Sequence, residues 1–181
     1  MAKSDISMAY RQLRCARDSL HLLGFTWKDR FFFDKCLVMG ASISCAKFED
    51  FSRAIQWILT SKLSVKHMSH ILDDFMFFGP PGSPECLNSL NAFLLLTESI
   101  GLPIKQEKTV LPSTCVELHG INFDSEKMEM SLPKDKVDRA LQQIEDMYKK
   151  RKVTLLQAQQ IHGLLNFACR AVPPGRTFLC M

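Results

Sequence analysis

The chain has 181 residues, of which 46% are hydrophobic and 13 are phenylalanine, so it has enough apolar material for a globular core. Its net charge of +4 is compatible with a nucleic-acid partner but is too small to indicate one. The 7 cysteines are odd in number and include no CxxC pair, which argues against a disulfide framework. Because the sequence has neither a signal peptide nor an apolar run of membrane-spanning length, we expect an intracellular protein without a membrane partner.

The first half of the chain alternates between strand-like and helix-like patterns. A strand is predicted to run through Asp5, followed by a short helix from about Ser7. Apolar runs at 20–25 and 30–33 flank a polar tip and predict a hairpin. Apolar residues at helical spacing over 46–59 predict an amphipathic helix, which precedes a second hairpin that carries two acids.

The second half begins with a helix predicted over 84–100, which Ser83 would cap and Gly101 would end. Beyond it, short strands give way to charged amphipathic helices. We expect strands at 109–111, 115–123 and 127–131, then helices at 134–151 and at 153–169, the last capped by Thr154. The predicted fold class is α+β, with an α+β unit over 1–131 and a helical unit over 132–181.

Two adjacent acids, Asp73 and Asp74, lie inside an otherwise apolar stretch at 70–79. Charges rarely occur within an apolar strand unless something pairs or coordinates them, and neighbouring carboxylates raise one another's pKa unless a cation neutralises them. The stretch therefore predicts a strand-turn-strand whose acidic tip faces a divalent metal. A solvated Asp-Asp turn between two core strands fits the same stretch, because aspartate is a favoured turn residue.

A third acid, Asp5, stands at the end of the first predicted strand. Two central antiparallel strands lying side by side would bring Asp5 next to Asp73. Carboxylates placed in this way can hold two Mg²⁺ ions, which activate an attacking hydroxyl and stabilise an in-line phosphoryl displacement. Magnesium prefers a few carboxylates together with substrate phosphates, so the arrangement suits nucleotidyl transfer, with Mn²⁺ as a substitute ion.

Five short segments form an ordered set that covers nearly the whole chain. They are Ala2-Lys3-Ser4-Asp5-Ile6 with Ala9-Tyr10, Leu37-Val38-Met39-Gly40-Ala41-Ser42-Ile43-Ser44, Ile71-Leu72-Asp73-Asp74, Gly101-Leu102-Pro103 through Glu107-Lys108-Thr109, and Leu118-His119-Gly120-Ile121. This set resembles polymerase motifs A to E of retroelement reverse transcriptases. The likeness is greatest to DIRS-like retrotransposons, for which two further phrases are typical: Gly79-Pro80-Pro81-Gly82-Ser83 and Pro174-Gly175-Arg176-Thr177-Phe178-Leu179.

The resemblance implies a polymerase palm, which is a ferredoxin-like antiparallel sheet with helices on one face, followed by a partial helical thumb. It implies an RNA-directed DNA polymerase that adds deoxynucleoside triphosphates to a primer paired with an RNA or DNA template. Asp5 and Asp73 would bind the two metals with help from the Ile6 carbonyl. Asp74 would support this site.

Further roles follow from the same resemblance. Tyr10 would be a steric gate against a 2′-hydroxyl, and Gly40 would let the backbone approach the template or the incoming nucleotide closely. Lys108, or with less support Lys105, would protonate the pyrophosphate leaving group. The strand that ends at Gly120 would be the primer grip. A basic thumb face would hold the duplex backbone through Lys134, Lys136, Lys149, Lys150, Arg151 and Lys152.

Three positions depart from the family pattern: Ile71 replaces tyrosine, and Val38 and Met39 replace the usual Pro-Phe or Pro-Gln. These changes concern the primer end and the template side, while the catalytic acids are retained. The family also has a fingers region before motif A and ribonuclease H downstream, so we expect a fragment of a larger polyprotein.

Each of these residues also has an ordinary structural interpretation. Taken alone, Tyr10 is an ordinary core aromatic, Lys108 is a surface lysine and the basic run at 149–152 is a solvated helix end. The alternative function is therefore that of a catalytically inactive retroelement remnant, which acts at most as a nucleic-acid or protein binding module.

Overall fold

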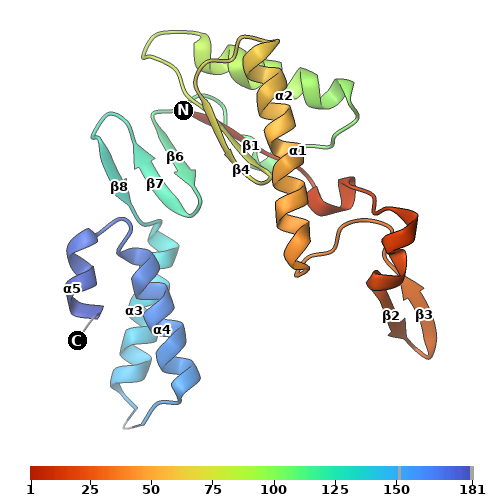
Figure 1. Cartoon of the computed structure of the whole chain (residues 1–181). Coiled ribbons are helices and arrows are strands. Elements are labelled where there is room, and N and C mark those ends of the chain that lie inside the picture. Colours follow the sequence, from red (N-terminus) through yellow and green to blue (C-terminus); the bar gives the residue numbers. More distant parts are fainter. Residues whose placement is uncertain (151, 180–181) are drawn as a thin grey trace. The chain divides into compact units, whose positions relative to one another are not determined.

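The computed structural model describes residues 1–150 and 152–179. The chain forms two compact units, Met1–Ser113 and Thr114–Met181 (Figure 1). The sequence pattern predicts the change of unit at 131, whereas the first compact unit ends at Ser113. The difference arises because the next three strands pair with one another in a separate sheet, which belongs to the second unit.

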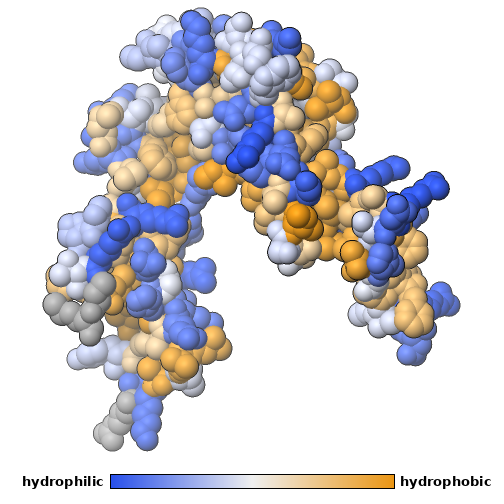
Figure 2. Space-filling model, in the orientation of Figure 1, coloured by the Kyte–Doolittle hydropathy of each residue, from blue (hydrophilic) through white to orange (hydrophobic). Residues whose placement is uncertain are grey.

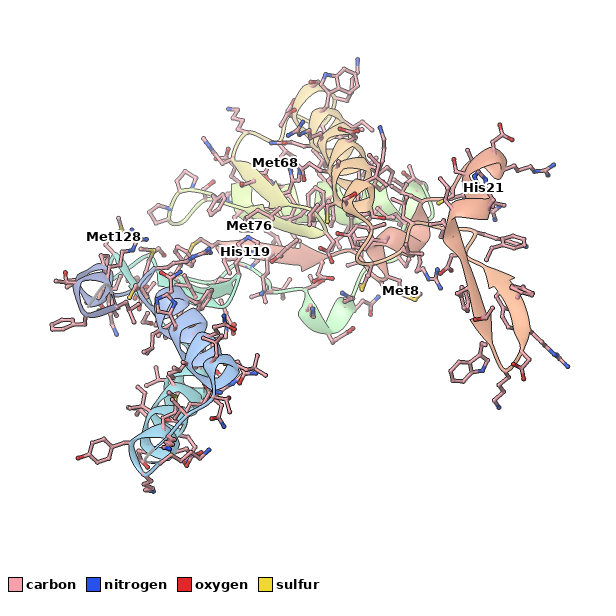
Figure 3. All side chains as sticks on the ribbon, turned by 60° about the horizontal axis from the view of Figure 1, so that its bottom comes forward. Met8, His21, Met68, Met76, His119 and Met128 are labelled. Carbon is pink, nitrogen blue, oxygen red and sulfur yellow. The ribbon has the colours of Figure 1, made fainter. Side chains whose placement is uncertain are left out.

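An antiparallel sheet of three strands in the order β1-β5-β4 lies at the centre of the first unit. Its strands are β1 (Ala2–Asp5), β4 (Met68–Ile71) and β5 (Asp74–Phe77). Figure 3 marks Met68 on β4 and Met76 on the central strand β5. Side chains alternate across a strand, so Phe75 and Phe77 share one face of β5 and Met76 points to the other.

Two helices, α1 (Ser42–Ser61) and α2 (Glu85–Ser99), cover the face of the sheet that carries Phe75 and Phe77. The predicted ranges 46–59 and 84–100 fall close to these bounds. Ser83 Oγ accepts a hydrogen bond from the Glu85 N–H at 3.1 Å. The buried core joins both helices to the sheet through Ala2, Ile6, Ala9, Phe48, Ile55, Leu59, Val65, Phe75, Phe77, Cys86, Leu90, Phe93 and Leu102.

The segment between β1 and α1 contains 3₁₀ turns at Ala9–Gln12 and Arg17–Leu23 and a hairpin of β2 (Gly24–Trp27) and β3 (Arg30–Phe33). The hairpin is confirmed, but residues 20–23 of its predicted first strand belong to the 3₁₀ turn. Lys28 and Asp29 at its tip both have positive φ, at +48° and +58°, and this left-handed turn matches the twist of the strands. Apolar side chains remain at the surface of the hairpin (Figure 2).

The strand predicted at 109–111 is reduced to a single bridge beside β1. The Val110 N–H donates to the Lys3 carbonyl at 2.9 Å, and the Lys3 N–H donates to the Val110 carbonyl at 3.2 Å. On one side, the Thr109 N–H donates to the Gln106 carbonyl, so it does not pair with β1. On the other side, Pro112 has no N–H with which to continue the ladder.

The second unit begins with an antiparallel meander of β6 (Cys115–Leu118), β7 (Ile121–Asp124) and β8 (Glu129–Ser131). Helices α3 (Lys134–Tyr148), α4 (Leu155–Ala168) and α5 (Arg176–Leu179) follow. The predicted cap at Thr154 is confirmed as a capping box with Gln157. Together the two units confirm the predicted α+β class. Within the described ranges, no helix has the length and apolar character needed to cross a membrane.

Candidate active site

The turn between β4 and β5 and the end of β1 place the three predicted acids on adjacent strands. Asp5 lies directly opposite Asp74 in the ladder of β1 and β5. The Ile6 N–H donates to the Asp73 carbonyl at 3.0 Å, which joins the end of β1 to the turn itself. Asp73 and Asp74 are both half-buried. The neighbouring antiparallel strands that the sequence predicts for these acids are therefore present.

Two lysines from the segment after α2 close on Asp5. Lys105 Nζ donates to one carboxylate oxygen at 2.5 Å, and Lys108 Nζ donates to the other at 3.3 Å. Only 14% of the Asp5 side chain is exposed. The hydrogen bond to Asp5 raises the pKa of Lys105, whereas burial lowers it. The negative charges of Asp5 and Asp73 raise this pKa further. Lys105, the less favoured lysine in the sequence, thus makes the shorter contact.

Tyr10 packs against helix α1. Its hydroxyl is 3.0 Å from Cys45 Sγ, and its ring meets Phe48 edge-on at 5.6 Å. The hydrogen bond with Cys45, then burial and the negative charges of Cys45 and Asp73, raise the pKa of Tyr10 to about 12. The charge of Asp73 thus reaches Tyr10, and the role of Tyr10 as a steric gate stays a prediction.

Replacing Cys45 with alanine should lower the pKa of Tyr10 from about 12 toward its ordinary value of 10.0. A raised folded-state pKa stabilises the folded chain below the unfolded value, and this contribution is lost as the pH rises through about 12. Ultraviolet titration of tyrosinate in a Tyr148→Phe background, where Tyr10 is the sole tyrosine, measures the shift. Identical titration curves with and without the thiol would refute the contact.

Helix α1 holds the acidic turn through contacts that the sequence analysis missed. Ser52 Oγ donates to the Leu72 carbonyl at 2.7 Å, and the Leu72 N–H donates to Glu49 Oε2 at 3.4 Å. The His70 ring stacks on Phe75 with 5.2 Å between ring centroids. The available signal was the helical spacing of Glu49 and Ser52, which places both on one face of α1.

The donor chemistry of the turn suits magnesium, because the carboxylates of Asp5, Asp73 and Asp74 are hard oxygen ligands. In this conformation the lysines neutralise Asp5, and Ile6, whose carbonyl the resemblance makes a ligand, is 0% exposed. Within 1–150 and 152–179, no cluster of three or more His, Cys, Asp or Glu side chains is arranged around one point. The acids thus fit the ion by type, and access to Asp5 requires Lys105 to move away.

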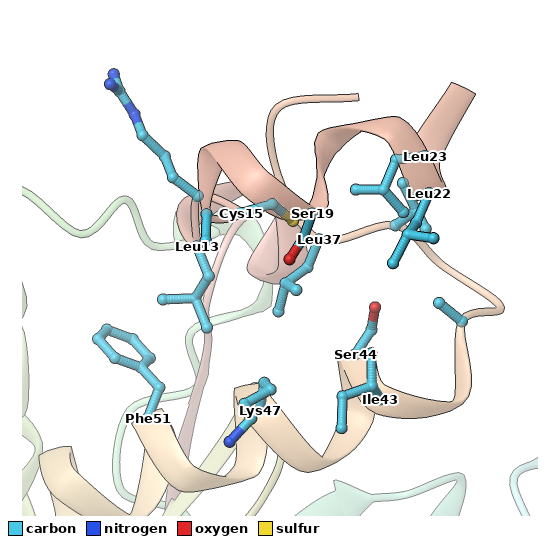
Figure 4. Close-up of a pocket in the computed structure, with 14 residues that line it drawn as sticks. Leu13, Cys15, Ser19, Leu22, Leu23, Leu37, Ile43, Ser44, Lys47 and Phe51 are labelled. Atoms are coloured by element: carbon cyan, nitrogen blue, oxygen red, sulfur yellow. The ribbon is translucent and has the colours of Figure 1, made fainter. Parts of the chain in front are cut away.

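Gly40 stands just before α1 with φ at +89°, and a Cβ there would meet no atom within 4 Å. Glycine is required at this position by its left-handed backbone and not by crowding from other protein atoms. A cavity of about 800 Å³ opens beside it, lined by Val38, Ile43 and leucines such as Leu22 (Figure 4). Among the described residues that line it, none is an acid of the turn, so the cavity is separate from the candidate site.

In the second unit, the ammonium group of Lys136 contacts other residues of the same unit. Its Nζ donates to the Gly120 carbonyl at 2.8 Å, lies 3.6 Å from Glu117 and sits over the Phe167 ring at 5.2 Å. This corrects its expected place on the basic face of the thumb, because its charge is used within the unit. The four other predicted lysines, Lys134, Lys149, Lys150 and Lys152, are exposed, and Arg151 lies outside the described residues.

Gly120→Ala should reduce the unfolding free energy by more than the backbone cost of about 1–2 kcal/mol that a φ of +78° carries, because an added Cβ would also lie 1.8 Å from Lys136 Nζ. The flexible lysine can move, but it then loses the Gly120 carbonyl. Gly101→Ala is the matched control, since its φ of +71° carries the same backbone cost and its Cβ meets nothing within 4 Å. Chemical denaturation of both variants isolates the contribution of Lys136. Equal losses would show that the Lys136 contact contributes nothing.

No model of a known protein family and no curated protein matches the chain. Solved structures are similar. The foamy viral protease-reverse transcriptase in complex with an RNA/DNA hybrid aligns with 99% of this chain and 23% of its own, with a TM-score of 0.74 and 20% identity. The form of that protein in complex with double-stranded DNA aligns with 92% of this chain and 27% of its own, with a TM-score of 0.71 and 22% identity.

Telomerase from Candida albicans, in complex with a fragment of telomeric RNA, aligns with 99% of this chain and 40% of its own, with a TM-score of 0.53 and 12% identity. The chain thus spans between about a quarter and two fifths of the length of these proteins. At such low identity the likeness concerns the fold. The chain has a reverse-transcriptase-like fold, in which the mixed helices and antiparallel sheets are similar to those of the palm and thumb.

Proposed function

We propose that the chain is the palm and part of the thumb of a retrotransposon reverse transcriptase, an RNA-directed DNA polymerase related to DIRS-like elements. The observation that carries the proposal is the meeting of Asp5 with the Asp73-Asp74 turn on adjacent strands of a polymerase-like sheet. The ordered sequence motifs and the likeness of the whole fold support the same function. The parent polyprotein would also carry ribonuclease H.

The proposed reaction joins a primer 3′-hydroxyl to the α-phosphate of a deoxynucleoside triphosphate and releases pyrophosphate. Asp5 and Asp73 would hold two Mg²⁺ ions, which supply charge neutralisation for the phosphates and a lowered pKa for the attacking hydroxyl. Lys105 and Lys108 already point at this site, so either can give a proton to the leaving pyrophosphate. Tyr10, which contacts Cys45 on helix α1, would exclude a ribose 2′-hydroxyl.

The proposed partners are a template-primer duplex and deoxynucleoside triphosphates. Similar structures have been solved with double-stranded DNA and with an RNA/DNA hybrid, which supports a duplex as the ligand of this fold. The exposed lysines of α3 and of the segment after it, which include Lys134, Lys149 and Lys150, offer charge for phosphate contacts. Fingers and ribonuclease H segments of the parent polyprotein would complete the enzyme.

The alternative is an inactive remnant that binds nucleic acid or protein. It is favoured by the closed state of Asp5, whose carboxylate is already neutralised by two lysines. Primer extension with Mg²⁺ separates the two functions when it is run on RNA and DNA templates with the chain alone and with upstream sequence restored. Templated incorporation in either form supports the polymerase, whereas duplex binding without incorporation in both forms supports the remnant.

A further inference from the structure

We infer that helix α1 sets the position of the Asp73 turn, with Glu49 and Ser52 as positioning residues, an inference that rests on the proposed polymerase function. Both backbone groups of Leu72, the residue before Asp73, are bound by α1. Ser52 Oγ donates to its carbonyl at 2.7 Å, and its N–H donates to Glu49 Oε2 at 3.4 Å. Ser52 is 0% exposed, so its bond to the carbonyl is shielded from bulk water.

The backbone of Leu72 needs these bonds. Its φ is +54°, in the left-handed region that residues with a side chain seldom adopt. Such a conformation persists only when its surroundings determine it, and functional sites are where it gathers. Because Asp73 follows directly, the direction of the Leu72 peptide units fixes where the Asp73 carboxylate emerges beside Asp5.

Glu49 connects this turn to the strand that leads into it. Its Oε1 lies 3.3 Å from His70 Nε2 and accepts a hydrogen bond from Arg53 Nε at 3.2 Å. The His70 side chain is only 5% exposed, and its Nε2 makes no hydrogen bond of good geometry among the described residues. The Glu49 carboxylate is therefore the polar group that faces this buried imidazole, while its other oxygen holds the turn.

One face of α1 also reaches the proposed gate. Cys45, Glu49 and Ser52 are separated by four and three residues, which places them on one stripe of the helix. Cys45 contacts the Tyr10 hydroxyl, whereas Glu49 and Ser52 hold the residue before Asp73. A single helix thus sets the spacing between the gate and the catalytic acid.

The test compares Glu49→Ala and Ser52→Ala with Asp50→Ala, which removes an exposed carboxylate from the same helix. Hydrogen exchange measured by NMR on each folded variant should accelerate at the Leu72 amide by about 10- to 100-fold in Glu49→Ala, as expected for loss of a bond to a charged group. Exchange there should also accelerate in Ser52→Ala and stay unchanged in Asp50→Ala. Glu49→Gln, which keeps an acceptor for the Leu72 N–H, should restore most of the protection.

Primer extension supplies the second readout. Glu49→Ala and Ser52→Ala should lower kcat by about 10- to 100-fold while the KM for the nucleotide changes little, which a general loss of folded protein would not produce. Unchanged exchange at Leu72 in both variants, or equal acceleration in Asp50→Ala, would overturn the positioning role. If the unsubstituted chain extends no primer with its upstream sequence restored, the proposed function fails, and the exchange result alone then decides whether α1 positions the turn.

Discussion

Asp73→Asn should reduce primer extension by about a thousandfold or more. The amide keeps the size and shape of the side chain, so the turn between β4 and β5 should persist. It removes the negative charge that would hold a divalent ion beside Asp5. A bound metal lowers the barrier to phosphoryl transfer by several kcal/mol, so losing the ion should slow the reaction strongly. Steady-state extension of a labelled primer with Mg²⁺ measures the loss, in whichever form of the chain shows activity.

Asp50→Asn is the control for this loss. It makes the same chemical change on a carboxylate that is 62% exposed on α1 and pairs only with Lys47 among the described residues. Extension should stay within about twofold of the unsubstituted chain, because isolated surface pairs contribute little. Extension by Asp73→Asn at the level of this control would show that Asp73 is not a catalytic residue.

Phe93→Ala should lower the unfolding free energy by about 3–5 kcal/mol, the largest stability effect that we expect from one substitution. Phe93 is 0% exposed and joins α2 to the central strand of the sheet. Its ring lies 4.7 Å from that of Phe75 and 5.5 Å from that of Phe77. Alanine would leave a cavity against β5, and chemical denaturation followed by circular dichroism measures the cost.

Leu95→Ala controls for helix propensity at a nearby position of α2. Leu95 is 66% exposed, so its loss should change stability by no more than about 0.5 kcal/mol. Since β5 begins with Asp74, loosening its contact with Phe93 should also reduce the order of the acidic turn. Equal costs for Phe93→Ala and Leu95→Ala would show that the core is not built as described.

The elements that carry the acids could be predicted because their signals are local. The Asp73-Asp74 pair interrupts an apolar run, and such a break in alternation marks a strand-turn-strand whatever surrounds it. The helix predicted over 84–100, observed as Glu85–Ser99, carries its own start and stop signals at Ser83 and Gly101. The prediction of a strand at residues 20–23 was wrong, because a run of leucines does not distinguish a strand from a 3₁₀ turn.

The contacts that shape the site could not be predicted in the same way. Lys105 lies 100 residues from Asp5 in the sequence, and although the family resemblance offers Lys105 for the same site, no local pattern indicates an ion pair between the two residues. The bonds from Glu49 and Ser52 to Leu72 likewise depend on how α1 packs against the sheet. Residue types thus indicate which acids gather, whereas long-range packing decides which cations and hydrogen bonds hold them.

Binding of Mn²⁺, measured by electron paramagnetic resonance in the presence of a primer-template duplex, tests most directly whether Asp5 and Asp73 form a metal site for nucleotidyl transfer. The account predicts that the unsubstituted chain binds the ion and that Asp5→Asn and Asp73→Asn each lose most of this binding. Asp50→Asn should bind as the unsubstituted chain does. Equal Mn²⁺ binding by all four proteins would contradict the assignment of the acidic turn as the catalytic centre.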